Sequence, residues 1–507
     1  MEAPFNKALH LRYWQRCLRT LLPHHYTPND SQRMTLGFFV IVAIDLLTPS
    51  STTTPPTDQQ QKQQPETTTN TKPILTPQDR RALRQWVLSC QHPQGGFCGS
   101  PTHVFPHQYQ DMGMGNANIA ATYFALLLLP MLSTEDDARG AFAGVDRTKT
   151  LRWLRRLQRS GDGSFGEVVY EVSPCPAGRE GGKVVVGGGK DMRYCYLAAT
   201  IRWILRGEGG EGHVEDIDVD ALVAHIRRSQ TYDGGFSESY RHESHAGYAY
   251  CAVAALALLD RPLELGKVAE GQTPCHKKSQ ALQKGIGDMP GFVSFLVSRQ
   301  FVYLEPSQEN TGKDYYEDDE EEDPDSANFL LANLSLADCT EAAKHVGFNG
   351  RCNKVADTCY TWWVLGSLSV LGVLDNGGDG DHPSLANNDN NTVDPIAIKA
   401  QREFLLGKTQ HDIGGFGKRP GDPPDIYHSS LGLAALATLG YPGLKKFDSG
   451  LCVSVDTVRK IEKGRRGLIE MGRKKESSSG GRVDFGKNLM DMAVSMGGGE
   501  RPDWLSV

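Results

Sequence analysis

Residues 221–259, ALVAHIRRSQTYDGGFSESYRHESHAGYAYCAVAALALL, contain one complete unit of the pattern that decides the fold. The first ten residues place apolar side chains at helical spacing with charges between them, which predicts an amphipathic helix. A Gly-Gly-Phe turn at 234–236 ends that helix, and the nearly uniform apolar run that follows predicts a second, buried helix. One unit is therefore a helical hairpin with a half-solvated member and a buried member.

The same glycine and phenylalanine turn recurs along the chain. The turns are QGGFCGS (94–100), GDGSFGE (161–167), YDGGFSE (232–238), VGFNGR (346–351) and IGGFGKR (413–419). An amphipathic segment precedes most of them and an apolar helix follows each, and the early segment QRMTLGFFVIVAIDLL adds a sixth apolar helix. Alternating amphipathic and apolar helices suit two concentric rings, so the sequence predicts an all-α protein, an α/α barrel (α6–α6 toroid).

Composition narrows the class of protein. The 507 residues are 39% hydrophobic, enough for a large core, and the net charge of −7 gives no electrostatic signature of nucleic-acid binding. Eleven scattered cysteines without a framework spacing indicate a reducing compartment. The longest apolar runs are too short to span a bilayer and the N-terminus has no signal-peptide pattern. We expect a cytoplasmic protein without stable membrane insertion.

The domain organisation follows from the low-complexity stretches. We expect the barrel in residues 1–445 and a flexible C-terminal tail in 446–507. Disordered insertions are expected inside the barrel because their composition cannot support a packed core. They lie near 50–73, 176–190, 262–290, 305–340 and 375–392.

Three residues near the fifth and sixth apolar helices have metal-ligand chemistry. Asp357 and Cys359 offer a carboxylate and a thiolate, and His428 in the DIYH element at 425–428 offers an imidazole. Three such ligands leave a tetrahedral Zn²⁺ with one open position, which is typical of a catalytic site. The alternative is structural: Asp357 caps a helix, Cys359 packs as a small apolar residue and His428 caps a helix or lies in a core.

A cationic group precedes these ligands. Arg351 and Lys354 in GFNGRCNKVADTCY (347–360) suit a phosphate-bearing ligand, although solvated surface charges are the alternative. Arg193 and His245, like the three candidate ligands, fall at or just before the starts of apolar helices. Helix N-termini carry partial positive charge, so their convergence at one mouth of a barrel favours an anionic head on an apolar tail, the shape of a lipid diphosphate.

The repeated GGF turns, RHESHAGYAY, GRCNKVADTCY and the Asp-x-Tyr-His element together resemble the β subunits of protein prenyltransferases. The opening LHLRYWQRCLRTLLPHHYTPNDSQRMTLGFF is most similar to the type I geranylgeranyltransferase branch. The resemblance implies an α/α barrel, a separate prenyltransferase α subunit and one catalytic Zn²⁺. It further implies geranylgeranyl diphosphate as donor, and small GTPases and other proteins with a C-terminal CaaX motif, X usually Leu, as acceptors.

The resemblance also implies roles for individual residues. Asp357, Cys359 and His428 match the zinc ligands, and the substrate thiolate takes the fourth position. Arg193 matches a residue near the acceptor's C-terminal carboxylate, with an ordinary helix-end arginine as the alternative. The positions that match diphosphate-binding segments are His245, Ala246, Gly247, Arg351, Cys352, Asn353 and Lys354, and Tyr360 adds a hydroxyl donor.

Two positions separate branches of the family. Thr35 stands where farnesyl enzymes carry a bulky Trp, so it implies room for a fourth isoprene unit. Lys418 stands where farnesyl enzymes carry an acidic Mg²⁺ ligand, so we expect no Mg²⁺ requirement. Trp363 lines the same apolar pocket or packs as plain core. Tyr427 departs from the type I pattern and matches the farnesyl one.

Three other functions stay open at this stage. A farnesyltransferase β subunit is the nearest, because of Tyr427. A terpene cyclase shares this type of barrel but needs an Asp-rich acid motif, and DIDVD at 216–220 is not Asp-x-Asp-Asp and precedes an outer helix. A noncatalytic helical-repeat scaffold would need none of the predicted ligands.

Overall fold

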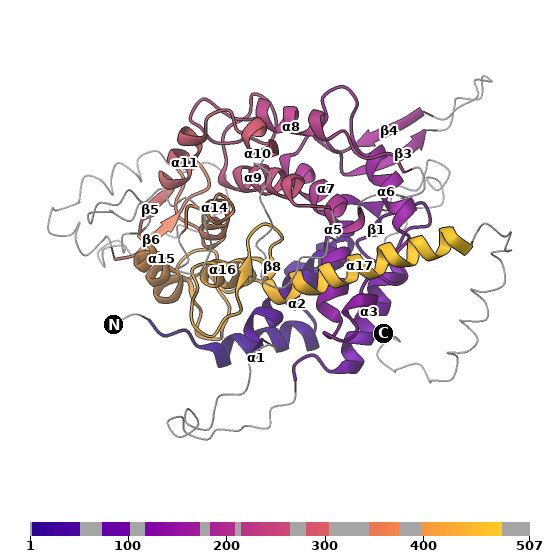
Figure 1. The fold of residues 1–507 in the computed structure, drawn as a ribbon. Helices are drawn as coiled ribbons and strands as arrows, with labels where there is room; N and C mark the ends of the chain where they lie inside the picture. The colour runs from indigo at the N-terminus through magenta and orange to yellow at the C-terminus, as the bar shows by residue number, and fades with distance from the viewer. Residues whose placement is uncertain are drawn as a thin grey trace, which may run out of the picture.

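The computed structural model describes residues 3–50, 73–101, 117–172, 183–207, 214–263, 280–303, 344–374 and 397–478. Six helices form its inner ring (Figure 1). They are α2 (Arg33–Leu47), α5 (Ile119–Leu132), α7 (Met192–Leu205), α9 (Ala246–Asp260), α14 (Thr358–Val370) and α16 (Ile426–Thr438). Each packs on the next, and α16 packs on α2, so the ring is closed. This is the predicted α/α barrel.

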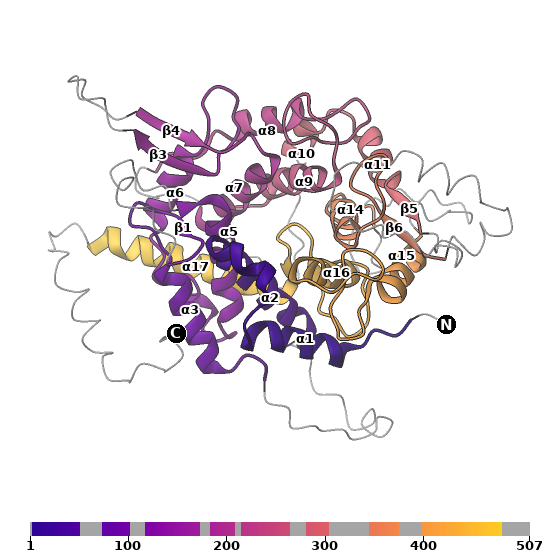
Figure 2. The same cartoon turned by 180° about the vertical axis from the view of Figure 1, so that it is seen from behind.

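An outer ring surrounds these six helices, as the two opposite views show (Figures 1 and 2). It contains α1 (Lys7–Arg19), α3 (Pro77–Ser89), α6 (Arg147–Arg156), α8 (Val219–Arg228), α11 (Met289–Val297) and α15 (Ile398–Phe404). Burial separates the rings as the patterning predicted. Twelve of the 14 residues of α5 are buried, whereas Val87 is the one buried residue of α3.

The five glycine turns share one backbone bond. In each turn, the residue after the buried Phe donates its N–H to a backbone carbonyl. That carbonyl belongs to the residue just before the glutamine that follows the outer helix. The pairs are Cys98 with Cys90, Gly166 with Leu157, Ser237 with Ser229, Asn349 with Arg299, and Gly417 with Thr409. Gly163 shows why glycine is needed here: its φ is +79°, and an added Cβ would lie 2.2 Å from the carbonyl oxygen of Ala221 on the next outer helix.

The repeated geometry extends to the glutamine before each turn. Oε1 of Gln158 accepts from the N–H of Asp218 at 2.7 Å, and Nε2 donates to the carbonyl of the same residue at 2.8 Å. Asp218 is the N-cap of α8, so the glutamine links one outer helix to the start of the next. Gln410 accepts from the N–H of Asn6, the N-cap of α1, which joins the last repeat to the first.

The prediction of a flexible tail from residue 446 is wrong for the described part of that segment. Strands β7 (Phe447–Asp448) and β8 (Val453–Ser454) form a hairpin, and α17 (Val455–Ser478) packs against α5, α7 and the short 3₁₀ helix η3 (Ala138–Gly140). Leu451, Val453 and Ile461 are fully buried. The basic residues of α17 lie among glycines and apolar residues at helical spacing, so charge alone gave the wrong prediction.

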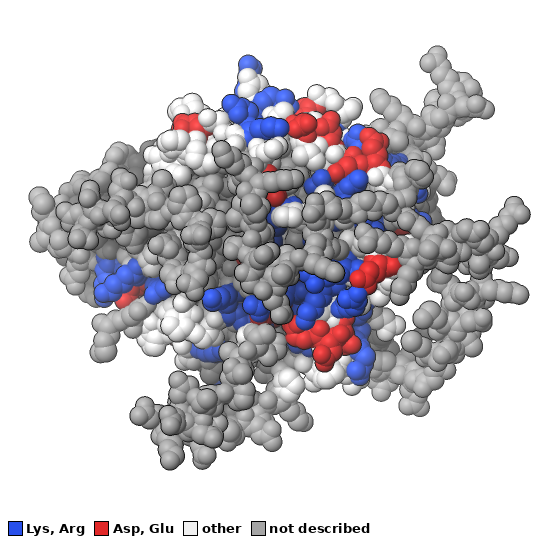
Figure 3. All heavy atoms as spheres, in the orientation of Figure 1, with Lys and Arg blue, Asp and Glu red and all other residues white. Residues whose placement is uncertain are grey.

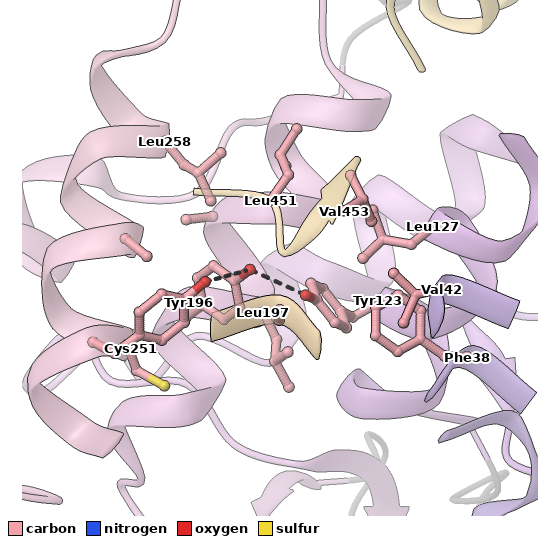
Figure 4. Close-up of a cluster of buried hydrophobic side chains, with 14 of the residues drawn as sticks. Phe38, Val42, Tyr123, Leu127, Tyr196, Leu197, Cys251, Leu258, Leu451 and Val453 are labelled. Atoms are coloured by element: carbon pink, nitrogen blue, oxygen red, sulfur yellow. Dashed lines mark hydrogen bonds between the residues drawn. The ribbon is translucent and has the colours of Figure 1, made fainter. Parts of the chain in front are cut away.

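Residues 447–454 enter the barrel, and we call them the C-terminal plug. Figure 4 shows Leu451 and Val453 near Tyr123 of α5 and Tyr196 of α7. The hydroxyl of Tyr250 donates to the carbonyl of Ser449 at 2.7 Å, and that of Tyr196 donates to the carbonyl of Gly450 at 3.2 Å. The plug therefore satisfies buried polar groups as well as filling space.

Ion pairs attach the same segment to the barrel surface. Nζ of Lys445 lies 2.7 Å from Oδ1 of Asp45 at the end of α2. Lys463 on α17 pairs with Glu135 at 2.7 Å. Figure 3 shows Lys and Arg side chains gathered over α17 on this face, with acidic groups beside them. Some basic residues of this C-terminal segment thus form ion pairs with acidic residues of the barrel.

Two predicted insertions also contain regular structure at their described ends. Strand β4 (Lys183–Gly187) pairs antiparallel with β3 (Val168–Val172), inside the expected 176–190 insertion. Helix α10 (Gln280–Gly285) lies inside the expected 262–290 insertion and packs on α8 and α9. Most of the 50–73 stretch, and all of 305–340 and 375–392, lie outside the described residues.

The remaining short elements connect the rings. They are η1 (His24–Gln32), η5 (Leu405–Thr409), and the antiparallel pairs β1 (Phe97–Cys98) with β2 (Ala117–Asn118) and β5 (Gln300–Val302) with β6 (Val346–Phe348). Within the described ranges, no helix has the length and apolarity to cross a membrane.

Candidate metal centre and anion-binding site

The three predicted metal ligands converge at the starts of two neighbouring inner helices. Asp357 is the N-cap of α14 and Cys359 lies in its first turn, while His428 lies in the first turn of α16. One ligand atom from each lies within 4.8 Å of the others. Because α14 and α16 are adjacent in the ring, residues about 70 positions apart form one cluster.

The capping role considered for Asp357 is real and coexists with the cluster. Its Oδ1 accepts from the N–H of Cys359 at 2.7 Å, as an N-cap carboxylate does. The same oxygen lies 3.3 Å from Nε2 of His428. Helix capping thus fixes the carboxylate in the position from which it meets the imidazole.

Asp425 belongs to this centre, although the sequence interpretation assigned it no role of its own. Its Oδ1 accepts from the N–H groups of Tyr427 and His428, and its Oδ2 lies 2.5 Å from Nδ1 of His428. This contact leaves Nε2 to face Asp357. A carboxylate behind a ligating histidine is a common arrangement at metal sites, and the signal was present in the Asp-x-x-His spacing.

The electrostatics of the cluster suit a cation. Burial raises the pKa of Asp357, but the hydrogen bond and charge of His428 outweigh it and hold that pKa below its usual value. Burial lowers the pKa of His428, whereas the two carboxylates raise it to about 9. Burial and the charge of Asp357 raise the pKa of the Cys359 thiol well above its ordinary value. A carboxylate, an imidazole and a thiol within one buried space are a donor set that fits Zn²⁺.

A second group of polar residues begins at His245, the N-cap of α9. Its Nδ1 accepts from the N–H of Gly247 at 3.0 Å, so Nε2 carries the proton and donates to the Tyr360 hydroxyl at 3.1 Å. Burial, reinforced by the charges of Arg351 and Arg193, lowers the pKa of His245 to about 4. The imidazole is therefore neutral, and the hydroxyl hydrogen of Tyr360 is directed to another acceptor.

The turn at 349–354 lies beside this pair. The N–H of Ala246 donates to the carbonyl of Gly350 at 2.8 Å, which joins the turn to the start of α9. Nδ2 of Asn349 donates to the carbonyl of Lys354 at 2.9 Å and closes the turn. Arg351 forms an exposed ion pair with Glu243 at 2.8 Å. Asn353 has a φ of +59°, a conformation that Asn tolerates well.

Lys418 and Arg193 occupy the same mouth. The carbonyl of Lys418 accepts from the N–H of Thr358 at the start of α14. Its side chain is exposed, and its charge opposes the rise in the pKa of the Cys359 thiol, which places the ammonium near the metal cluster. Arg193 pairs with Asp191, the N-cap of α7, at 2.5 Å, so part of its charge is already compensated.

Half-buried aromatic residues continue from the metal cluster into the barrel. The Tyr427 and Phe39 rings meet edge to face with centroids 5.3 Å apart. Thr35 lies one helical turn before Phe39 on α2 and is also half-buried. Trp363 on α14 lies 5.2 Å from Tyr250, centroid to centroid. The mouth thus joins a polar rim to an apolar interior.

Comparison with known proteins gives this architecture a family. A family model for the prenyltransferase alpha-alpha toroid domain matches residues 5–453. The chain belongs to this family. The match ends at the C-terminal plug, so α17 of this prenyltransferase toroid lies beyond it.

Two curated relatives of this prenyltransferase toroid carry the name geranylgeranyl transferase type-1 subunit beta. The protein from Arabidopsis thaliana is 26% identical, with 87% of each chain covered. That from Dictyostelium discoideum is 24% identical over 88% of this chain and 94% of the relative. A solved structure, Candida albicans protein geranylgeranyltransferase-I complexed with GGPP, shares the fold with a TM-score of 0.59. It is 23% identical and covers 91% of this chain and 99% of that one.

Proposed function

We propose that this chain is the catalytic β subunit of a type I protein geranylgeranyltransferase, which transfers a geranylgeranyl group from its diphosphate to a cysteine thiol of CaaX proteins. The observation that carries the proposal is the cluster of Asp357, Cys359 and His428 beside the His245–Tyr360 pair. The names and coverage of the two curated relatives support the same branch.

Asp357, Cys359 and His428 would hold one Zn²⁺. When bound, zinc supplies a site for the acceptor's thiolate and lowers the pKa of that thiol, giving a nucleophile at neutral pH. Asp425 keeps His428 oriented for this role through the contact at Nδ1. The Arg193 guanidinium, on the neighbouring rim, would bind the acceptor's C-terminal carboxylate.

The diphosphate would lie over the starts of α9 and α14. Tyr360 donates its hydroxyl hydrogen, held in place by the Nε2–H of His245, and Ala246 and Gly247 lie in the positive first turn of α9. Arg351, Lys354 and Lys418 supply positive charge as the bond to the diphosphate breaks. The ammonium of Lys418 takes the place of a metal there, so no Mg²⁺ is required.

The isoprenoid would pack on the half-buried aromatic residues of the inner helices. Thr35 leaves space beside Phe39 for the fourth isoprene unit, and Trp363 provides a flat apolar wall. A prenyltransferase α subunit completes a cytoplasmic heterodimer, and small GTPases with a CaaX sequence are the acceptors.

The test is single-turnover transfer by the full chain co-expressed with an α subunit, with zinc present and Mg²⁺ withheld. The acceptor is a peptide ending in Cys-aliphatic-aliphatic-Leu, and the donors are geranylgeranyl and farnesyl diphosphate. Transfer that prefers the geranylgeranyl donor supports the proposal. Asp357→Asn should abolish transfer, whereas Asp412→Asn, on an exposed turn of the same mouth, should retain it.

One observation favours a second candidate, a farnesyltransferase β subunit. Tyr427 projects onto Phe39 and occupies volume that a smaller residue would leave to the lipid or peptide. Preference for the farnesyl donor together with a Mg²⁺ requirement would move the assignment to that branch. A stable, zinc-loaded heterodimer that transfers neither lipid would indicate a scaffold.

A further inference from the structure

Arg299 is an exception to the repeat. In four of the five turns, the residue before the glutamine is small or apolar and buried. These residues are Cys90, Leu157, Ser229 and Thr409. In the fourth turn along the chain the same backbone position holds Arg299, which is only 7% exposed. A buried arginine where the fold accepts a serine is not needed for the turn itself, so its side chain requires another explanation.

The guanidinium of Arg299 is directed at one sulfur atom. Nη1 and Nη2 each lie 3.4 Å from Sγ of Cys352, and Nη2 also contacts Oγ of Ser298 at 3.3 Å. The side chain passes over the Phe295 ring at 4.9 Å. In the described ranges, the buried Nε of Arg299 has no hydrogen-bond partner. The thiol is thus the main acceptor for a buried cation.

Cys352 connects this arginine to the proposed diphosphate site. It lies between Arg351 and Lys354 in the 349–354 turn, and it is the exposed member of the cysteines in the described residues. Arg299 therefore contacts the turn twice, through Sγ of Cys352 and through its own carbonyl, which accepts from the N–H of Asn349 at 2.9 Å. These two contacts hold the turn on its buried side, so its solvent-facing surface stays available for a ligand.

We propose that Cys352 is a site of reversible thiol modification, and that modification there separates its sulfur from the Arg299 guanidinium and weakens binding of the isoprenoid diphosphate. The inference rests on the proposed function, since it assigns regulation to that site. The chemical class of the modifier is a small disulfide such as oxidised glutathione. Exposure of Cys352 gives such a molecule access, whereas Cys90, Cys195 and Cys251 are buried.

The exchange needs no other reactant. The Cys352 thiolate attacks one sulfur of the small disulfide, whose S–S bond breaks as a new S–S bond to Cys352 forms. The second glutathione leaves as a thiolate and takes up the proton that Cys352 released. The attached glutathione carries carboxylates into a turn whose charge should attract diphosphate, and its bulk separates the sulfur from the Arg299 guanidinium.

The experiment uses the full chain co-expressed with an α subunit and treated with oxidised glutathione. Mass spectrometry locates the adducts, and a fluorescent analogue of geranylgeranyl diphosphate gives the dissociation constant. We expect Cys352 to be modified first, the dissociation constant to rise at least about fivefold, and a thiol reductant to restore it. Zinc content, measured in parallel, should stay constant, which separates this effect from damage at Cys359.

Variants test whether modification of Cys352 causes the rise in the dissociation constant. In Cys352→Ser the dissociation constant should be the same with and without oxidised glutathione. The matched control is Cys98→Ser, which removes a half-buried thiol in the first repeat and should keep the full response. Arg299→Lys should raise the dissociation constant without any reagent. If that variant does not fold, Cys352→Ala tests the same contact from the exposed side and should weaken binding more than Cys352→Ser.

Two results would overturn the inference. One is complete modification of Cys352 with unchanged diphosphate binding, and the other is an equal response in Cys352→Ser. Either can occur in a chain that transfers the lipid normally, so the proposed function would survive. Conversely, a chain that binds the diphosphate with a Cys352-dependent response but transfers nothing would contradict the proposed function alone.

Discussion

Single residues at the mouth of the barrel combine structural and chemical roles. One oxygen of Asp357 caps α14 and also faces the imidazole of His428. His245 caps α9 and, because its Nδ1 is used in the cap, presents the Nε2–H to Tyr360. Capping consumes defined atoms of a side chain, so it decides which atoms remain for a ligand.

Asp425→Asn should weaken zinc binding by about 10- to 100-fold, because an amide cannot hold the histidine as a carboxylate does. Competition with a chromophoric chelator measures the affinity, and metal analysis of the purified chain gives the occupancy. Asp412→Asn is the matched control. Unchanged zinc affinity in Asp425→Asn would show that the 2.5 Å contact to His428 does not support the metal.

Thr35→Trp should lower the preference for geranylgeranyl over farnesyl diphosphate by at least about tenfold, since an indole would fill the space beside Phe39. The measurement is the ratio of kcat/KM for the two donors. Gln32→Trp places the same side chain at an exposed position just before α2 and should leave the ratio unchanged. A ratio that does not move in Thr35→Trp would place the lipid elsewhere.

At the scale of elements, the repeat depends on a small set of polar contacts between consecutive hairpins. The glutamine before each turn accepts from the backbone N–H of the N-cap residue of the next outer helix, as Gln158 does from Asp218. The buried Phe of the turn supplies the apolar part of the same junction. These junctions hold the outer ring together where helix packing alone would allow sliding.

Gln158→Ala should reduce the free energy of unfolding by about 1–3 kcal/mol, because the N–H of Asp218 loses its acceptor and the carbonyl loses one of its two donors, the other being the N–H of Leu222. Urea unfolding followed by far-ultraviolet circular dichroism measures the loss. Gln94→Ala removes an exposed glutamine from the first turn and should change the free energy of unfolding by less than about 0.5 kcal/mol.

His10 makes the closure of the ring sensitive to acid. Burial lowers its pKa to about 4, and its Nδ1 accepts from the N–H of Gly415 while Nε2 contacts Gln410. The unfolded chain binds a proton near pH 6.5, so it holds more protons than the folded chain between about pH 6.5 and 4. Stability from this group is complete above that window and is lost as the pH falls through it.

His10→Gln should therefore flatten the pH dependence of unfolding, removing about 2 kcal/mol of the decline between pH 7 and pH 5. His225 and His245 also have pKa values near 4, so part of the decline should remain. His24→Gln, at an exposed position, is the control. An unchanged slope in His10→Gln would show that His10 is not the group that titrates.

At the scale of the whole molecule, the chain closes the barrel with its own C-terminal segment. The C-terminal plug inserts Leu451 and Val453 among the inner helices (Figure 4). Its backbone carbonyls accept hydrogen bonds from Tyr196 and Tyr250. Helix α17 then crosses α5 and α7 on the outside. Helices α7 and α9, which carry Arg193 and His245 at their N-terminal ends, therefore also contact the plug.

Ending the chain after Lys446 should lower the melting temperature by more than about 10 °C or prevent soluble expression, because apolar inner surface loses its cover and two buried hydroxyl groups lose their carbonyl acceptors in the plug. Ending it after Ser478 should change the melting temperature by no more than about 2 °C. Scanning calorimetry of the two truncated chains, each with the α subunit, measures both. A stable chain ending at Lys446 would contradict the role of the plug.

The sequence by itself predicted the two rings, the five turns and the three candidate metal ligands that the fold brings together at the starts of α14 and α16. Periodicity records burial directly, whereas Asp357, Cys359 and His428 each had a structural alternative in the sequence, and Asp357 does cap α14. The fold of residues 446–478 depended on tertiary structure, because glycines and basic residues resemble a tail until a barrel surface receives them. The same is true of Arg299 and Asp425: each was an ordinary charged residue in the sequence, and only its neighbour in space, a thiol or an imidazole, gave it a role.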